Sequence, residues 1–126
     1  MKFLFITNDP AIARHAYHNG AEWVMVDLEK HGKQERQGHL DTVMSAHSVD
    51  DVATLREVLP PGSLLVRLDP INQASAQQVD AAIEAGADWL MLPFFHGPDE
   101  VAHFCRMVGG RRPVMLLAET PGACDL

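Results

Sequence analysis

The sequence predicts an α/β fold built on a parallel sheet, and two observations carry this prediction. Apolar runs occupy residues 3–7, 23–26, 64–68, 89–92 and 114–118, and each of them ends at a polar or turn residue. Segments in which apolar residues recur at helical spacing lie between these runs. Strands buried on both faces read as continuous apolar runs, and their regular alternation with helices is typical of a parallel sheet.

A near-repeat within the chain indicates which kind of parallel sheet this is. Residues 18–27 and residues 84–93 share a helix end, the order Gly-Ala-acid-Trp and then a buried strand. About two βα units separate them, as expected for repeated units, so the pattern favours a (β/α) barrel of the TIM type. Such a barrel has eight strands in about 250 residues. We therefore expect residues 1–126 to be a single domain of about five strands and four helices, a half-barrel or truncated barrel that forms the N-terminal part of a longer one.

Capping and turn residues predict the helix boundaries in order. Helix starts are expected where a capping residue or a proline precedes an apolar stripe, at Asp9-Pro10, residues 48–51, Ser75 and residues 98–100. Helix ends are expected at glycine or proline, at residues 19–20, residues 60–62, Gly86 and residues 109–110. Two alternatives to a longer barrel remain open for the five expected strands. The chain could pair with a second copy of itself, or it could form a five-stranded open sheet.

Composition and charge exclude several classes of protein. The chain has 17 acidic and 10 basic residues and a formal charge of −7, which disfavours nucleic acid as a partner. No apolar run approaches the roughly 20 residues that a membrane helix needs, and the apolar N-terminus meets polar residues too early for a signal peptide. Cys105 and Cys124 make no disulfide framework. We expect a cytoplasmic protein.

Charged residues stand at the carboxyl ends of three predicted strands, where ligands bind in parallel α/β folds. Asp27 and Glu29 follow the second strand, Arg67 interrupts the third and Glu119 ends the fifth. Alternation points Asp27 and Glu29 to the same side. Arg67 either pairs with one of these carboxylates or binds a substrate carboxylate or enolate through its planar fork. Glu119 either suits the N-terminal dipole of a following helix or is an oxygen ligand for Mg²⁺.

The stretch from residue 30 to residue 47 is unusually long for a connection in an α/β unit, which usually spans about 2–6 residues. It leaves a strand at the expected ligand-binding edge and is rich in basic and histidine residues. One interpretation is a solvated lid or an oligomer contact. The other places basic groups such as His31 and Lys33 against a carboxylate substrate.

The chain resembles the HpcH/HpaI-type hydroxy-oxo-acid aldolase and citrate lyase β-subunit family, within the phosphoenolpyruvate/pyruvate superfamily. The resemblance rests on four segments in order, at residues 23–33, 65–70, 86–93 and 117–120. Members of this family are full barrels, so it covers their N-terminal half. Where aldolases of the family have a histidine directly after the strand-two glutamate, this chain has Lys30, with His31 one position later.

The resemblance implies a divalent metal, Mg²⁺ or Mn²⁺, that chelates pyruvate or another oxo-acid. By position, Glu119 matches a metal ligand and Arg67 the arginine that neutralises the enolate. Asp27 and Glu29 match the acidic motif that holds metal-bound water or positions the base. The implied function is a metal-dependent carbon–carbon lyase of the class II aldolase type.

Two alternatives remain open beside that function. One is a lyase acting on an acyl-CoA of the malyl, citramalyl or citryl kind, and the other is a catalytically inactive half-barrel that serves as a scaffold subunit. The second metal ligand of the family, an aspartate after the sixth strand, has no counterpart in the 126 residues, so inactivity of the isolated chain is one of the expectations that follow from the resemblance. We also expect open sheet edges to favour a homo-oligomer.

Overall fold

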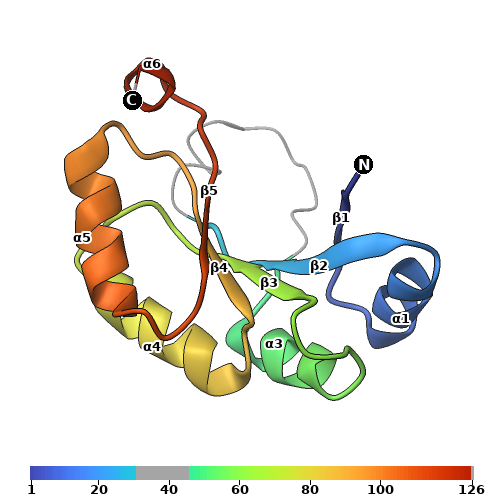
Figure 1. Cartoon of the computed structure of the whole chain (residues 1–126). Helices are drawn as coiled ribbons and strands as arrows, with labels where there is room; N and C mark the ends of the chain where they lie inside the picture. The colour runs from blue at the N-terminus through green and yellow to red at the C-terminus, as the bar shows by residue number, and fades with distance from the viewer. Residues whose placement is uncertain (31–45, 126) are drawn as a thin grey trace, which may run out of the picture.

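In the computed structural model, which describes residues 1–30 and 46–125, strands and helices alternate along the chain (Figure 1). The strands are β1 (Phe3–Ile6), β2 (Ala21–Asp27), β3 (Leu64–Arg67), β4 (Trp89–Leu92) and β5 (Val114–Leu116). The helices are α1 (Pro10–His18), α3 (Val49–Arg56), α4 (Ser75–Ala85), α5 (Pro98–Val108) and the short α6 (Pro121–Cys124). The predicted α/β class and the position of each long helix in the order are confirmed.

The strands form one sheet in the order β1-β2-β3-β4-β5, and every neighbouring pair is parallel. Each strand therefore lies beside the strand that follows it in the sequence, with a helix in the connection, as in a (β/α) barrel. The curved sheet is flanked by α3, α4 and α5 along one side, while α1 lies at the β1–β2 end (Figure 1). This arrangement is that of a partial TIM-type barrel.

Side-chain alternation divides the core into two layers. Val24, Val66 and Leu90 point to the face covered by the helices and belong to the large apolar cluster that includes residues of α3, α4 and α5. Their alternate neighbours form a smaller cluster on the other face, made of Met25, Leu65 and Met91 with partly buried Trp23, Trp89, Met115 and Leu117. We call this second face the inner face, because it corresponds to the interior of a barrel.

The two tryptophans of the near-repeat meet on the inner face. Trp23 of β2 and Trp89 of β4 are equivalent residues of the two similar segments, and their rings lie edge to face with centroids 5.9 Å apart. Edge-to-face packing is a favoured geometry for aromatic pairs. The near-repeat thus reflects a structural equivalence of the two βα units.

Most helix boundaries follow the predicted signals, with two exceptions. The prediction that α3 ends at residues 60–62 is wrong: α3 ends at Arg56, and the residues after it form a turn whose carbonyls, at Leu59 and Pro60, accept from the Arg56 guanidinium. Asp9 caps α1 by accepting hydrogen bonds from two backbone N–H groups, and Ser48 begins α3 with a capping box. Gly86 ends α4 in the left-handed conformation. The prediction that Ser75 caps α4 is wrong: the N-cap is Ala74, and Ser75 is the first helical residue. The Ser75 hydroxyl instead accepts a hydrogen bond from the N–H of Asn72, 2.8 Å away.

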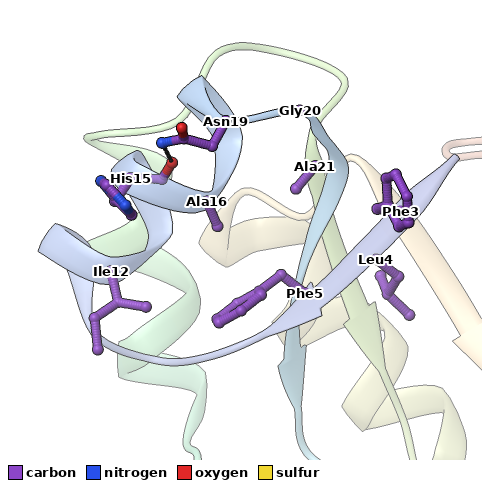
Figure 2. Close-up of a pocket in the computed structure, with 9 residues that line it drawn as sticks. All are labelled: Phe3, Leu4, Phe5, Ile12, His15, Ala16, Asn19, Gly20 and Ala21. Atoms are coloured by element: carbon purple, nitrogen blue, oxygen red, sulfur yellow. Dashed lines mark hydrogen bonds between the residues drawn. The ribbon is translucent and has the colours of Figure 1, made fainter.

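Strand β1 is exposed along its whole length, so the expectation that every strand is buried on both faces is wrong for this one. Beside it lies an apolar groove of about 360 Å³, lined by Phe3, Leu4, Phe5, Ile12, His15, Ala16, Asn19, Gly20 and Ala21 (Figure 2). Phe5 points from β1 into the space between the strand and α1. An edge strand of this kind is a surface on which a sheet extends or associates.

Within the described residues, none of the helices is both long enough and apolar enough to cross a membrane.

Candidate functional site

An arginine and two acidic residues meet on the inner face at the carboxyl ends of β2 and β3. Asp27 and Arg67 are direct neighbours in the parallel register of these strands. Alternation places both on the same face as Met25 and Leu65. In parallel α/β folds this edge of the sheet is where ligands bind.

The Arg67 guanidinium makes two hydrogen bonds to the carboxylate of Asp27. Its Nε donates to Oδ1 of Asp27 at 3.0 Å and its Nη2 donates to Oδ2 at 2.6 Å, which is the bidentate geometry of a strong arginine–carboxylate pair. The Nε atom also lies 3.2 Å from Oε2 of Glu29. Of the two roles that the sequence allows for Arg67, pairing with these carboxylates is therefore present in the structure. The predicted proximity of Asp27 and Glu29 to one another is present too.

The surroundings keep the Arg67 guanidinium charged. Burial alone would lower its pKa, but the hydrogen bond with Asp27 and the negative charges of Asp27, Glu29 and Glu119 outweigh burial and raise the pKa above its ordinary value. Glu29 is 2% exposed, so its interaction with Arg67 takes place away from bulk water. A permanent positive charge is thus fixed at the carboxyl edge of the sheet.

Glu119 follows β5 and is tied to the end of β4. Its Oε2 accepts a hydrogen bond from the backbone N–H of Phe94 at 3.0 Å. Phe94 has φ of 54°, a left-handed conformation that is unusual for a bulky residue. Such strained backbone is held in place by surrounding contacts and often occurs at functional sites.

The connection after β5 packs closely against the one after β4. The Thr120 hydroxyl donates to the carbonyl of Phe95 at 2.7 Å and also caps α6. A Cβ atom at Gly122 would lie 1.9 Å from the carbonyl oxygen of His96, so only glycine fits at this contact. Glu119 is therefore presented by a tightly packed corner rather than by a free loop.

The donor chemistry at this edge fits a hard divalent cation, but its ligand set is incomplete in the described part of the chain. Carboxylate oxygens are what Mg²⁺ prefers, and it is usually held by one or two carboxylates with water and substrate oxygens. Among residues 1–30 and 46–125, no group of three histidine, cysteine or acidic side chains is close enough together to hold a metal. Glu119 offers one such carboxylate.

Both described ends of the long connection after β2 are hydrogen-bonded at this edge. The N–H of Lys30 donates to Oδ1 of Asp69 at 2.5 Å, and Gln78 of α4 in turn holds the Asp69 carboxylate at 3.2 Å. At the other end, Nδ1 of His47 accepts the N–H of Asp27 at 2.9 Å. The predicted substrate-binding residues His31 and Lys33 lie outside the described residues.

Sequence reasoning assigned no role to Asp69 or His47. Asp69 follows Arg67 by two positions, so strand alternation could have placed it on the same side of the chain. His47 carried no such signal, because its contact joins positions 20 residues apart through the sheet edge.

A protein-family model described as HpcH/HpaI aldolase/citrate lyase matches residues 2–111. The chain belongs to this family. The match extends from β1 through α5, so it includes Asp27, Glu29 and Arg67 and ends before Glu119. By its description the family consists of aldolases and lyases, and no curated protein matches the chain in sequence.

Solved structures agree on the fold. The chain is similar to an HpcH/HpaI aldolase from Desulfitobacterium hafniense DCB-2, with a TM-score of 0.63 and 17% identity over 98% of this chain and 44% of that one. It is also similar to monomers of the dimeric phosphoribosylanthranilate isomerase from Thermotoga maritima, with a TM-score of 0.67 and 16% identity over 99% of this chain and 58% of that one. The chain thus spans about half the length of these structures.

Proposed function

We propose that this chain supplies the arginine and carboxylate part of the active site of a divalent-metal-dependent carbon–carbon lyase of the class II aldolase type. The substrate class is a hydroxy-oxo-acid, and the reaction passes through a pyruvate-like enolate. The observation that carries the proposal is the guanidinium of Arg67, held by Asp27 and Glu29 at the carboxyl edge of the sheet. Family membership supports the same class of reaction.

Arg67 has donors left for an anionic substrate. A guanidinium carries five N–H groups. In the described part of the chain, the hydrogen bonds of Arg67 use Nε and Nη2, which leaves both N–H groups of Nη1 for an oxo or carboxylate oxygen. Because Asp27 fixes the plane of the fork, those donors are already oriented before substrate binds, and preorganised donors stabilise charge that develops during a reaction.

The proposed cleavage step develops negative charge on the oxo-acid fragment, and this charge must be stabilised. A base takes the proton of the substrate hydroxyl, the carbon–carbon bond breaks, and its electron pair passes to the oxo-acid fragment as an enolate while an aldehyde leaves. The enolate then takes up a proton to give the oxo-acid. The positive charge of Arg67 faces this enolate, and the raised pKa of Arg67 keeps that charge in place throughout. Asp27 and Glu29 hold Arg67, and in this proposal they also position the base.

A divalent cation, Mg²⁺ or Mn²⁺, would polarise the oxo group and share the enolate charge. Glu119 is the residue of this chain that would hold it. The Phe94 N–H takes one hydrogen bond to the Glu119 carboxylate and so fixes its orientation. Since the solved structures are about twice as long, we propose that further ligands come from polypeptide outside these 126 residues.

A scaffold without activity is the second candidate, and one observation favours it. No group of three histidine, cysteine or acidic side chains that could hold a metal occurs among residues 1–30 and 46–125, and a scaffold needs none. An acyl-CoA lyase would use the same residues, and a dependence of turnover on CoA would distinguish it from an aldolase.

The decisive experiment compares Arg67 variants of the native protein in a hydroxy-oxo-acid cleavage assay with added Mg²⁺ or Mn²⁺. Arg67→Lys keeps the charge but loses the bidentate fork, and Arg67→Ala loses both. We expect kcat to fall on the order of 10²–10³-fold for Arg67→Ala, as for the removal of one oxyanion donor. Arg106→Ala, at an exposed position of α5, is the control and should keep full activity.

Unchanged turnover in Arg67→Ala at saturating metal would refute the lyase mechanism. Wild-type protein with no cleavage activity, whose melting temperature does not change with Mg²⁺ or Mn²⁺, would favour the scaffold.

A further inference from the structure

His47 stands directly before the N-cap of α3 and is 5% exposed. Its Nδ1 lies 2.9 Å from the backbone nitrogen of Asp27. This contact occurs where the β1–β2 ladder ends. The N–H of Thr7 still bonds to the carbonyl of Met25 at 3.2 Å. A regular parallel ladder would next join the N–H of Asp27 to the carbonyl of Thr7, but the His47 ring takes that N–H instead.

The direction of this hydrogen bond fixes the chemical state of the ring. A backbone N–H can only donate, so Nδ1 of His47 must accept and cannot carry a proton. The ring is therefore the neutral tautomer with its proton on Nε2. A histidine protonated on both nitrogens would place a donor against a donor at this buried position.

The hydrogen bond acts on the residue that holds Arg67. Oδ1 of Asp27 accepts both from Nε of Arg67 and from the N–H of Glu29, at 3.0 and 3.1 Å. The backbone N–H of Asp27 is thus held by His47. The carboxylate of Asp27 is held by Arg67 and by the backbone N–H of Glu29. A small rotation of this peptide would swing the carboxylate and turn the plane of the Arg67 fork.

His47 is itself supported by a well-defined helix start. The N–H of Ser48 donates to Oδ2 of Asp51 at 2.8 Å, which completes the capping box of α3. The side chain of Asn8, at the end of β1, donates to the same oxygen at 3.3 Å. The backbone of His47 therefore leads directly into the capped start of α3, and side chains on well-ordered elements can be oriented precisely.

We propose that His47 is a positioning residue for the lyase reaction: as the Nε2-protonated neutral imidazole it holds the Asp27 peptide, and through Asp27 it orients the Arg67 guanidinium toward the substrate. This inference rests on the proposed function for its catalytic meaning. The contact from His47 through Asp27 to Arg67 does not depend on that function, because it follows from the hydrogen-bond distances between these residues.

Three variants of the native protein test the contact, and they differ in where an acceptor is placed. His47→Asn puts an amide oxygen close to the position of Nδ1 and can still accept the Asp27 N–H. His47→Gln carries its acceptor further out, and His47→Leu has none. His103→Leu, at an exposed position of α5, is the matched control for loss of an imidazole.

We expect His47→Leu and His47→Gln to lower kcat on the order of 10–100-fold, the range typical when a supporting residue is lost. KM should change little, because the enolate charge that Arg67 faces exists mainly in the transition state. His47→Asn should restore most of kcat, and the control should match wild type. Melting temperatures, measured alongside, separate this pattern from a loss of folded protein.

The proposal is overturned if His47→Asn is as impaired as His47→Leu at equal melting temperature, or if His47→Leu keeps wild-type kcat. A second measurement does not need activity. Nitrogen-15 NMR of wild type should show an unprotonated Nδ1 on His47, and the Nε–H signal of Arg67 should shift in His47→Leu but not in His47→Asn.

The NMR result separates the two proposals. If wild type cleaves no hydroxy-oxo-acid but the Arg67 signal follows the Asn and Leu variants as expected, the lyase function fails and the positioning contact holds. If the His47 ring carries its proton on Nδ1, or the Arg67 signal is unchanged in His47→Leu, the positioning contact fails whatever the activity.

Discussion

At the scale of single residues, the described part of the site is organised around the half-buried guanidinium of Arg67. Its two carboxylate partners described here, Asp27 and Glu29, are both almost fully buried. Removing one partner of such a cluster leaves charge without compensation in a poorly solvated place, which costs more than the interaction itself is worth. The Arg67 pairing therefore matters to stability through what its absence would leave behind.

Replacement of Arg67 by methionine, of similar length and without charge, should destabilise the native protein by about 3–5 kcal/mol at neutral pH, because its close ion pairs with the buried carboxylates of Asp27 and Glu29 are lost. Urea unfolding measures this free energy. Arg111→Met is the matched control, since it breaks an exposed pair with Asp80 and two hydrogen bonds to carbonyls at the end of α5, and it should cost about 1–2 kcal/mol. Equal losses in the two variants would contradict the buried-charge argument.

The pH dependence of that loss has a definite sign. The pKa of Arg67 is raised in the folded state, so its stabilising contribution is complete below the ordinary arginine pKa and is lost only at strongly alkaline pH. In wild type, Arg67 should therefore add no pH dependence near neutrality. In Arg67→Met the destabilisation should shrink as pH falls toward about 4, because protonated carboxyl groups carry no charge and need no counter-ion. A loss that grows at acid pH would show that the carboxylates are not the cause.

The sequence was informative about which residues meet but not about how they are held. The charged positions Asp27, Glu29 and Arg67 were found because strand alternation and a parallel register bring them to one edge. The contact of His47 with Asp27 could not be predicted, because it depends on where β1 leaves the sheet and on where the long connection re-enters it. Whether Arg67, Glu119, His31 and Lys33 act on a substrate stays a prediction.

At the scale of elements, local signals predicted most boundaries because each of them satisfies backbone groups within a few residues. The capping box at Ser48 and the left-handed Gly86 are such cases. Ser75 failed as a cap because a preceding turn competes for its hydroxyl, which accepts the N–H of Asn72, while the Asn72 side chain accepts the N–H of Ala74. The sequence shows that such residues are present but not which partner each one takes.

Gly86 joins α4 to β4 at a point where backbone conformation and packing both require glycine. Its φ is 117°, and a Cβ atom there would lie 2.7 Å from Cδ of Arg56. That side chain cannot easily move, because its guanidinium bonds to the Gly86 carbonyl and to Asp88. Packing at this corner is therefore linked to the ion pair that joins α3 to the start of β4.

Substitution of Gly86 by alanine should thus cost more than the same substitution at Gly20, which has φ of 108° but open space around it. We expect about 1–2 kcal/mol from backbone strain at either position and a further loss at Gly86 from displacement of Arg56. Thermal and urea unfolding of the two variants provide the comparison. If Gly20→Ala is equally destabilised, the contact with Arg56 contributes nothing.

At the scale of the whole molecule, the fold has a polar carboxyl edge and an apolar open side. The parallel order β1-β2-β3-β4-β5 ends in two edge strands, and β1 exposes Phe3, Phe5 and Ile6 by 57%, 44% and 50%. The apolar groove next to β1 is lined by none of the residues of the Arg67 site, and mostly by apolar side chains (Figure 2). A continuous apolar surface of this kind is usually covered by other protein.

This open side predicts that the 126-residue chain, studied by itself, associates with further copies. Replacing both Phe3 and Phe5 by lysine places charge on the edge strand and in the apolar groove, and charged side chains are the usual means by which proteins prevent pairing at sheet edges. Sedimentation velocity over a range of concentrations should show larger species for the unmodified chain and a shift toward monomer for Phe3→Lys/Phe5→Lys.

Tyr17→Lys, on α1 outside the groove, is the control and should associate like the unmodified chain. A chain that stays monomeric at every concentration would mean that the exposed edge does not drive association, and it would remove the basis for a homo-oligomer formed through β1.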